Sequence, residues 1–295
     1  MGTPDIIFPN LGIEISHISP VAFSVFGLEI KWYGIFIALG ILAGTSIAFR
    51  YTKRNGLSND TFLDFLLLAI PIAILFTRLY FVIFNWDLYK DNPLKIFAFR
   101  DGGMGVYGGI IAAITTAVIF SKVKKVSLGA IGDTGVVGLI MGQVIGRIGN
   151  FINMEAFGDY TNSFLAMQYK LSNVNSVHVT QKMLDNLVIR EGVQYIQVHP
   201  TFLYEALWNL GLFIILNIYR KHKKFQGELL VLYCAGYGLG RFWIESLRTD
   251  QLVIFGGVPV SMVVSALFCV GAVTFIVIKR IKIKKSGKNI VESNV

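Results

Sequence analysis

One stretch near the C-terminal end carries ionisable side chains at a spacing that places them together. Its members, at steps of four, four and three residues, are Tyr237, Arg241, Glu245 and Arg248. In a helix this spacing puts all of them on one face. Glu245 can pair with either arginine, which leaves the face with one net positive charge. A purely structural ion pair needs no third charge, so this face is a candidate functional site.

A second candidate lies in the glycine-rich run of residues 146–158, Gly-Arg-Ile-Gly-Asn-Phe-Ile-Asn-Met-Glu-Ala-Phe-Gly. Here Arg147 and Asn150 share a helix face. The glycines let another backbone or a lipid head group approach closely, and they favour an end of the helix near the membrane surface. Arginine binds phosphate through two parallel hydrogen bonds, so Arg147 and Arg241 together indicate a site for an anionic phospholipid.

Motifs for other chemistries are absent. The sequence has no His-Glu-x-x-His motif, no Cys–His cluster at zinc spacing, no Gly-x-Ser-x-Gly elbow and no P-loop. The four histidines, at positions 17, 178, 199 and 222, are scattered. Cys234 and Cys269 lie in apolar stretches, which is typical of small buried hydrophobic residues. We therefore expect no metal and no cofactor.

The composition predicts the environment of these residues. Of 295 residues, 54% are hydrophobic and only 15% are charged, against about 25% charged in an ordinary soluble domain. The mean hydropathy is +0.61. These values exclude a disordered chain and a small disulfide-stapled scaffold. The net charge of +9 comes from basic residues between apolar runs, so nucleic acid is not expected as a partner, and the chain is predicted to be a polytopic membrane protein.

A helix needs about 20 mostly apolar residues to cross the hydrocarbon layer. Seven runs qualify, and they predict an all-α membrane domain of seven helices. The fourth run is glycine-rich, and the fourth and sixth both carry ionisable groups. The runs are Trp32–Phe49, Phe62–Phe84, Gly103–Ser121, Leu128–Phe151, Thr201–Tyr219, Glu228–Leu247 and Phe255–Ile278.

The distribution of basic residues predicts the orientation. Sixteen lysines and arginines fall in four short segments, 50–54, 122–125, 220–224 and 279–288, whereas eight are spread over the longer connections on the opposite side. The positive-inside rule places the C-terminus in the cytoplasm and, with seven spans, the N-terminus outside.

One external connection is too long for a turn and predicts a small exoplasmic head. This insertion, residues 158–198, alternates apolar and polar residues over Val174–Val179 and Tyr195–Val198, as short strands do. It belongs to a predicted transmembrane domain of residues 1–285. Residues 286–295 are predicted to form a flexible cytoplasmic tail.

Three arginines lie inside predicted spans, namely Arg78, Arg147 and Arg241. An arginine near the bilayer centre costs at least about 2.5 kcal/mol, so each is a candidate functional residue. Their positions place all three in the outer half of the membrane. Polar groups near the outer starts of the inward-running helices join them: Tyr33, Tyr107 and His199.

For any one of these residues taken alone, a purely structural role is an alternative to a functional role. An arginine can form a salt bridge between helices or extend to the interface. Tyr33, beside Trp32, is typical of an interfacial aromatic belt, and His199 before Pro200 is typical of a helix start.

The run from Gly146 to Gly158 resembles, position for position, the signature G-R-x-G-N-F-x-N-x-E-x-x-G of bacterial phosphatidylglycerol:prolipoprotein diacylglyceryl transferases. The resemblance extends in the same order from about Pro20 to Lys279. Its further parts are Phe23 with Trp32-Tyr33-Gly34, the turn Asp101-Gly102-Gly103-Met104, His199-Pro200-Thr201 with Leu203-Tyr204-Glu205, and Arg241-Phe242 with Glu245 and Arg248.

This resemblance implies a seven-helix enzyme of the bacterial cytoplasmic membrane. Such an enzyme moves the sn-1,2-diacylglyceryl group of phosphatidylglycerol to the thiol of the lipobox cysteine in a prolipoprotein signal peptide. A thioether forms and glycerol phosphate is released, which is the first step of lipoprotein maturation. From the resemblance and from the polar residues in the spans together, we expect the catalytic residues to be Arg147, Arg241, Tyr107 and Tyr33. The expected substrate-binding residues are Asn150, Gly158, Tyr237, Glu245, Arg248 and His199.

One position departs from the family pattern. Many members have histidine in the turn G-G-M-x-x-H-G-G, proposed as the base for the thiol, but here that residue is Tyr107. The alternative function is a transporter or flippase for an anionic lipid or another anion. The sequence favours the enzyme, because the inner halves of the spans lack ionisable groups apart from Asp64 and Asp133, and no inverted repeat is present.

Overall fold

The computed structural model describes residues 3–99, 102–249, 251 and 259–286. A helix occupies each of the seven predicted stretches. Six of them, within the described residues, are long and apolar enough to cross a membrane, so the chain is a polytopic, mostly helical membrane protein. The helices are α1 (Trp32–Thr52), α2 (Asn59–Phe84), α3 (Val106–Lys124), α4 (Leu128–Ile152), α6 (Thr201–Tyr219), α7 (Glu228–Glu245) and α8 (Val260–Ser286); α7 is not among the six.

Several predicted ends differ from the observed ones. Helix α3 begins at Val106 and not at Gly103, because Gly102 and Gly103 have left-handed φ angles of 81° and 72°. Helix α8 continues to Ser286, eight residues beyond the predicted end. Its basic residues remain helical because their long side chains can reach water past the apolar surface. Asp101, the first part of the predicted last span and the tail 287–295 lie outside the described residues.

The chain divides into two compact units. The first comprises Met1–Ile47, Val136–Lys223 and Leu229–Lys288, and the second, among the described residues, Ala48–Gly135 and Lys224–Glu228. In the first unit the middle parts of α1 and α4 pack at backbone distance. A Cβ atom on Gly44 would lie 2.5 Å from the carbonyl oxygen of Gly138, and one on Gly40 would lie 3.1 Å from that of Gly142. This small-residue contact aligns the two helices.

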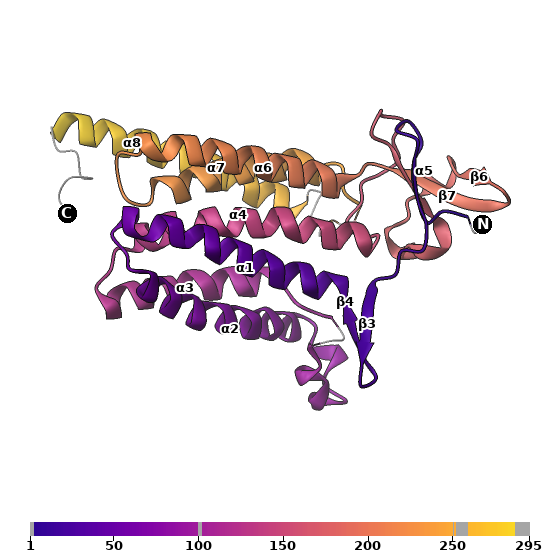
Figure 1. The fold of residues 1–295 in the computed structure, drawn as a ribbon, viewed down its shortest axis with the longest axis horizontal. Coiled ribbons are helices and arrows are strands. Elements are labelled where there is room, and N and C mark those ends of the chain that lie inside the picture. The colour runs from indigo at the N-terminus through magenta and orange to yellow at the C-terminus, as the bar shows by residue number, and fades with distance from the viewer. Residues whose placement is uncertain (1–2, 100–101, 250, 252–258, 287–295) are drawn as a thin grey trace. The chain divides into compact units, whose positions relative to one another are not determined.

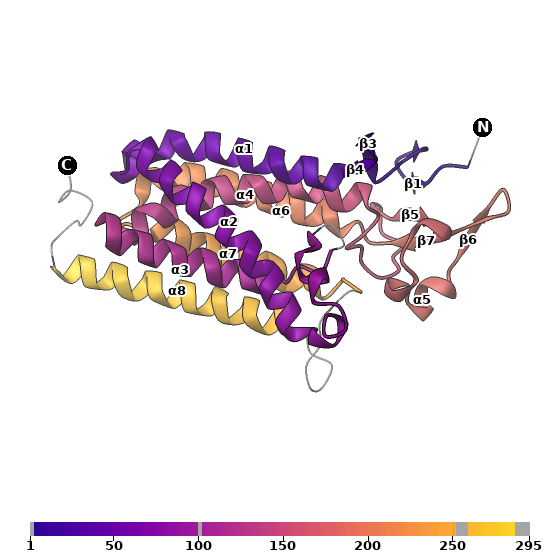
Figure 2. The ribbon, with the colours of Figure 1, turned by 90° about the horizontal axis from the view of Figure 1, so that it is seen from below.

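A five-stranded antiparallel sheet completes the first unit, in the order β2-β1-β5-β7-β6. Figures 1 and 2 show it beyond the end of α4 and the start of α6. Its core contains Ile6, Met167, Tyr169, Met183 and Ile196, each 0% exposed. The strands are β1 (Ile6–Phe8), β2 (Ile13–Ile15), β5 (Met167–Lys170), β6 (Val188–Arg190) and β7 (Val193–Val198), with the four-residue helix α5 (Gln181–Leu184) beside them.

The strand predicted at Tyr195–Val198 is confirmed as part of β7, but the strand predicted at Val174–Val179 is wrong. That segment forms 3-10 turns, because the side chain of Asn175 accepts a hydrogen bond from the backbone N–H of Val177 and favours a turn. The N-terminal strands β1 and β2 were not predicted. A separate hairpin, β3 (Val21–Val25) and β4 (Leu28–Lys31), leads into α1.

In the second unit, α2 and α3 lie side by side (Figures 1 and 2). Arg78 connects α2 to the segment before α3. Arg78 is 3% exposed. Its five N–H donors meet five backbone carbonyls: Nε bonds Ile96, Nη1 bonds Gly102 and Gly103, and Nη2 bonds Lys95 and Ala98. Arg78 therefore has the structural role that the sequence left open for it.

Replacing Arg78 with Lys should loosen the segment of residues 86–103. Lysine has three donors and no planar fork, so at least two of the five carbonyls lose their partner. Hydrogen exchange of the segment should become faster, whereas the exposed Arg54→Lys should leave it unchanged. Unaltered protection in Arg78→Lys would contradict the structural role.

Candidate functional site

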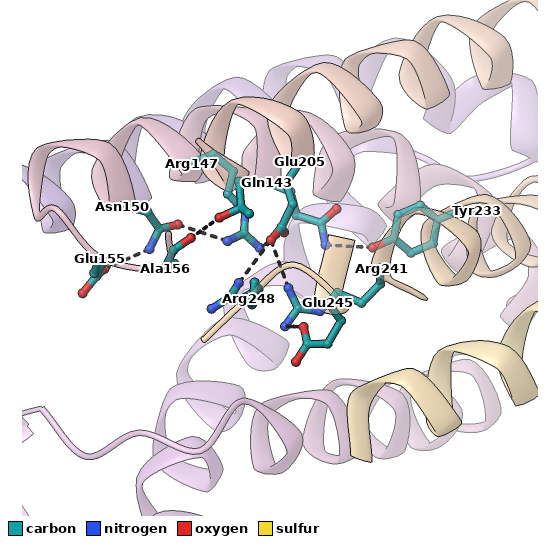
Figure 3. Close-up of polar contacts among 11 residues, drawn as sticks. Gln143, Arg147, Asn150, Glu155, Ala156, Glu205, Tyr233, Arg241, Glu245 and Arg248 are labelled. Atoms are coloured by element: carbon teal, nitrogen blue, oxygen red, sulfur yellow. Dashed lines mark hydrogen bonds and ion pairs between the residues drawn. The ribbon is translucent and has the colours of Figure 1, made fainter. Parts of the chain in front are cut away.

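A single carboxylate in the first unit contacts three arginines (Figure 3). Oε1 of Glu205 lies 3.0 Å from Nη1 of Arg241 and 3.1 Å from Nη1 of Arg248. Oε2 of Glu205 forms an ion pair with Nη2 of Arg147. The Glu205 side chain is only 4% exposed, so both of its oxygens are bonded within the protein. Glu205 thereby holds together residues of α4, of α6 and of the end of α7.

The segment after α4 helps to position Glu205, because the start of α6 is hydrogen-bonded to its backbone. Helix α4 ends at Ile152, and Met154 and Ala156 adopt left-handed φ angles of 51° and 57°. The hydroxyl of Thr201, at the start of α6, donates a hydrogen bond to the carbonyl of Ala156. This bond ties the first turn of α6, and with it Glu205, to the signature run.

Gly158 acts on the site through the backbone. It forms a β-bridge with Arg248, and its N–H donates to the carbonyl of His199 at 3.0 Å. A Cβ atom at this position would lie 2.7 Å from the carbonyl oxygen of Leu247, closer than real Cβ atoms approach. The glycine therefore lets the segment carrying Arg248 pack against the segment after α4. The role of Gly158 in the structure is to allow this close backbone approach.

The remaining signature residues orient Arg147. Its Nη1 lies 3.2 Å from Oδ1 of Asn150, as the shared helix face predicts. Nδ2 of Asn150 in turn donates to Glu155 at 2.9 Å, and Asn153 donates to the same Glu155 oxygen at 3.4 Å. The guanidinium of Arg147 is thus held on one side by Asn150 and on the other by Glu205.

Three members of the predicted stripe, Tyr237, Arg241 and Glu245, lie on α7, but the prediction that Arg248 continues the same helix face is wrong, because α7 ends at Glu245 and Arg248 forms a β-bridge with Gly158. Nη2 of Arg241 lies 2.5 Å from Oε2 of Glu245, so Glu245 pairs with Arg241. One turn earlier, Tyr237 stacks on Tyr233 with ring centroids 5.4 Å apart, and the Tyr233 hydroxyl accepts a hydrogen bond from Gln143. A second set of polar side chains, Gln143 on α4 and Tyr233 and Tyr237 on α7, therefore lies next to the arginines along the two helices.

The charge of the cluster fits a monoanion. The three guanidinium groups and the two carboxylates in direct contact with them, Glu205 and Glu245, sum to one positive charge; Glu155 lies one hydrogen bond farther away, on Asn150. The side chains of Arg147 and Arg241 are 18% and 19% exposed, so each keeps a surface that a ligand can reach. A phosphodiester carries one negative charge and accepts hydrogen bonds from arginine forks. The arrangement is suited to holding a phosphate and to stabilising charge that develops on its oxygens.

Of the other predicted site residues, Tyr33 packs against the signature run, and His199 and Tyr107 have other neighbours. The Tyr33 ring packs on Gly149, where an added Cβ would lie 2.7 Å from it. Nδ1 of His199 lies 3.3 Å from the Tyr204 hydroxyl. Burial, reinforced by Lys182 and opposed by Asp159, lowers the pKa of His199. Tyr107 belongs to the second unit, at the start of α3, with its ring centroid 6.3 Å from that of Tyr80.

Glu205 was not among the predicted site residues, although it belongs to the resembling motif. The sequence signal for Glu205 is its position as an acidic residue inside the apolar span Thr201–Tyr219. The arginines at 147, 241 and 248 need a counter-charge, which such a residue can supply. Among the described residues no group of three His, Cys, Asp or Glu side chains is arranged to hold a metal ion.

Comparisons with known proteins agree with the signature. The family model for prolipoprotein diacylglyceryl transferase matches residues 20–278. A phosphatidylglycerol–prolipoprotein diacylglyceryl transferase of Clostridioides difficile (strain 630) is 39% identical over 269 residues, which cover 91% of this chain and 97% of the relative. A protein of the same name from Bacillus cereus (strain B4264) is 39% identical over 281 residues, covering 95% and 98%.

Replacing Glu205 with Ala should destabilise the protein strongly. Removing one partner of a buried ion pair costs about 3–5 kcal/mol, since a buried charge is left uncompensated. The thermal unfolding temperature in detergent should therefore fall. The matched control is Asp64→Asn, which removes a half-exposed carboxylate paired with Lys124 at 2.9 Å and should change stability by less than about 1 kcal/mol. Equal effects of the two variants would contradict the central role of Glu205.

Proposed function

Because this chain belongs to the prolipoprotein diacylglyceryl transferase family, we propose that it transfers the sn-1,2-diacylglyceryl group of phosphatidylglycerol to the lipobox cysteine of prolipoproteins. The reaction forms a thioether, releases glycerol phosphate and begins lipoprotein maturation. The protein is a multi-pass protein of the bacterial cell membrane. The arginine cluster around Glu205 is the structural observation that carries the proposal, because it offers one net positive charge to a phosphodiester. Nothing in the comparisons favours a transporter or flippase.

The proposed arrangement in the membrane has seven spans, with the N-terminus outside and the C-terminus in the cytoplasm. Helix α7 is the sixth of these spans in chain order, and its 18 residues extend about 27 Å. The sheet formed by β1, β2 and the insertion 158–198 is then the exoplasmic head. Residues 1–285 form the membrane domain with this insertion. The arginines lie at the outer leaflet, where head groups are found.

In the proposed mechanism, Arg147 and Arg241 bind the phosphate of phosphatidylglycerol. The cysteine thiolate attacks the sn-3 carbon of the diacylglyceryl glycerol. A carbon–sulfur bond forms, the carbon–oxygen bond to the phosphate breaks, and the electron pair leaves with glycerol phosphate. Charge thus increases on the phosphate oxygens, and fixed guanidinium groups stabilise it without reorganisation. Glu205 and Glu245 hold the forks in place before substrate binds.

Supporting roles go to the other predicted residues. Asn150 orients Arg147, and Gly158 positions Arg248, which adds positive potential at the phosphate. Four further residues are proposed to contact the substrates: Tyr33, Tyr107, His199 and Tyr237.

Replacing Arg147 or Arg241 with Lys should reduce transfer at least a hundredfold while the protein stays in the membrane. Lysine keeps the charge but loses the two-pronged hydrogen bond. Purified variants are incubated with phosphatidylglycerol and a lipobox peptide, and the peptide mass is measured. Arg54→Lys, at an exposed position, is the control. Normal turnover in both site variants would remove the proposed phosphate-binding role, and absence of the adduct with the unsubstituted protein would contradict the transferase function.

Tyr107→Phe should reduce transfer only modestly. A tyrosine has an ordinary pKa near 10 and a cysteine thiol near 8.5, so a neutral tyrosine is a poor base for the thiol at pH 7. We propose that the positive potential of the arginines favours the thiolate directly and that Tyr107 donates a hydrogen bond. Tyr107→His should also remain active. Loss of all turnover in Tyr107→Phe, with normal protein level and lipid binding, would instead identify an obligatory proton carrier.

Cysteine labelling tests the orientation. In a background lacking Cys234 and Cys269, a membrane-impermeant reagent applied from outside should label a cysteine at Asn173 and not one at Lys221, both exposed positions. The reverse pattern would overturn the N-out topology and the outer-leaflet site.

A further inference from the structure

A small cavity lies beside the arginine cluster and between α6 and α7. Arg241 and Glu205 form part of its wall, so the cavity is continuous with the proposed phosphate site. The complete lining is Glu205, Trp208, Asn209, Tyr237, Gly240, Arg241 and Ile244. The polar members other than the ion pair are not needed to hold the arginines.

Asn209 is the unusual member of this lining. It is 2% exposed, and its side-chain amide, which hydrogen-bonds no other described residue, is not among the fully enclosed polar groups because it borders the cavity. The neighbouring Trp208 donates to the carbonyl of Gly236 at 2.9 Å, and Asn217, farther along α6, donates to that of Phe213 at 2.7 Å. An amide at a cavity wall can hydrogen-bond a water there and exchange that water for a ligand group that offers an equivalent hydrogen bond. An amide that faces a cavity and has no hydrogen-bond partner in the protein is suited to bind a ligand.

The position of Asn209 indicates which part of a lipid it meets. It follows Glu205 by four residues, about 6 Å along α6 toward the helix's C-terminal end. In the proposed orientation this direction leads from the head groups toward the acyl chains. The two ester groups of a diacyl phospholipid lie on the acyl-chain side of its phosphate. An ester carbonyl is neutral and accepts a hydrogen bond, which an amide N–H can donate.

We propose that Nδ2 of Asn209 donates a hydrogen bond to an ester carbonyl of the bound phospholipid and makes the enzyme selective for diester over diether lipids. This inference rests on the proposed transferase function and on phosphate binding by the arginines. Two anchors, the phosphate on Arg147 and Arg241 and the carbonyl on Asn209, fix the glycerol backbone at both ends. The sn-3 carbon lies between them, so its angle of approach to the thiolate is restricted.

The test compares diester phosphatidylglycerol with its diether analogue, which has the same head group and chain length but no ester carbonyls. The unsubstituted enzyme should prefer the diester about tenfold in kcat/KM, as one buried hydrogen bond allows. Asn209→Leu, of similar volume, should lose about tenfold on the diester and less than twofold on the diether. The matched control is Asn217→Leu, on the same helix, which should leave the lipid preference unchanged.

Equal losses of Asn209→Leu on both lipids would overturn the proposal, and so would no loss on either lipid. Asn209→Ala serves as a second variant if the leucine variant does not fold. The binding ratio of the two lipids, measured by native mass spectrometry in detergent, gives a readout independent of turnover. Absence of transfer by the unsubstituted protein would count against the proposed function. A diester binding preference that Asn209→Leu abolishes would still support the Asn209 contact.

Discussion

The Glu205 carboxylate is the constraint on which the rest of the site depends. Three guanidinium groups in a membrane protein carry a large desolvation cost unless a counter-charge lies among them. Glu205 supplies it with both oxygens, and Glu245 adds a second carboxylate on Arg241. The remaining single positive charge is what an anionic phospholipid can neutralise. In the proposed function, the cluster that stabilises the fold is also the one that binds the lipid.

Such a cluster requires three chain segments to meet within hydrogen-bond distance, and the backbone provides that closeness. Gly44 and Gly138 bring α1 and α4 together without side chains between them, and Gly158 lets the end of α7 approach the segment after α4. The bond from Thr201 to Ala156 fixes the start of α6. A polar network in a membrane stabilises only when its members are satisfied, so these close contacts are part of the site.

Arginines of the same kind inside apolar spans serve two different purposes here. Arg78 uses its five donors on backbone carbonyls of one segment and acts as a structural anchor. Arg147 and Arg241 contact carboxylates and retain partial exposure, which leaves them able to bind a ligand. The chemistry of the hydrogen-bonding partners distinguishes the two cases.

The sequence by itself determined the helical membrane class, the position of α6 to the residue, and the shared helix of Tyr237, Arg241 and Glu245, because hydropathy and helix periodicity are local properties. It did not determine that Arg248 lies beyond the end of that helix. The signature run and the Arg147–Asn150 pair were also predictable from local spacing. The turns at Val174–Val179 were not, since an asparagine side chain outcompetes the alternating pattern. The role of Glu205 was decided only by the tertiary structure. Ion pairs between helices depend on which faces meet, and no spacing within one helix records the faces of its neighbours.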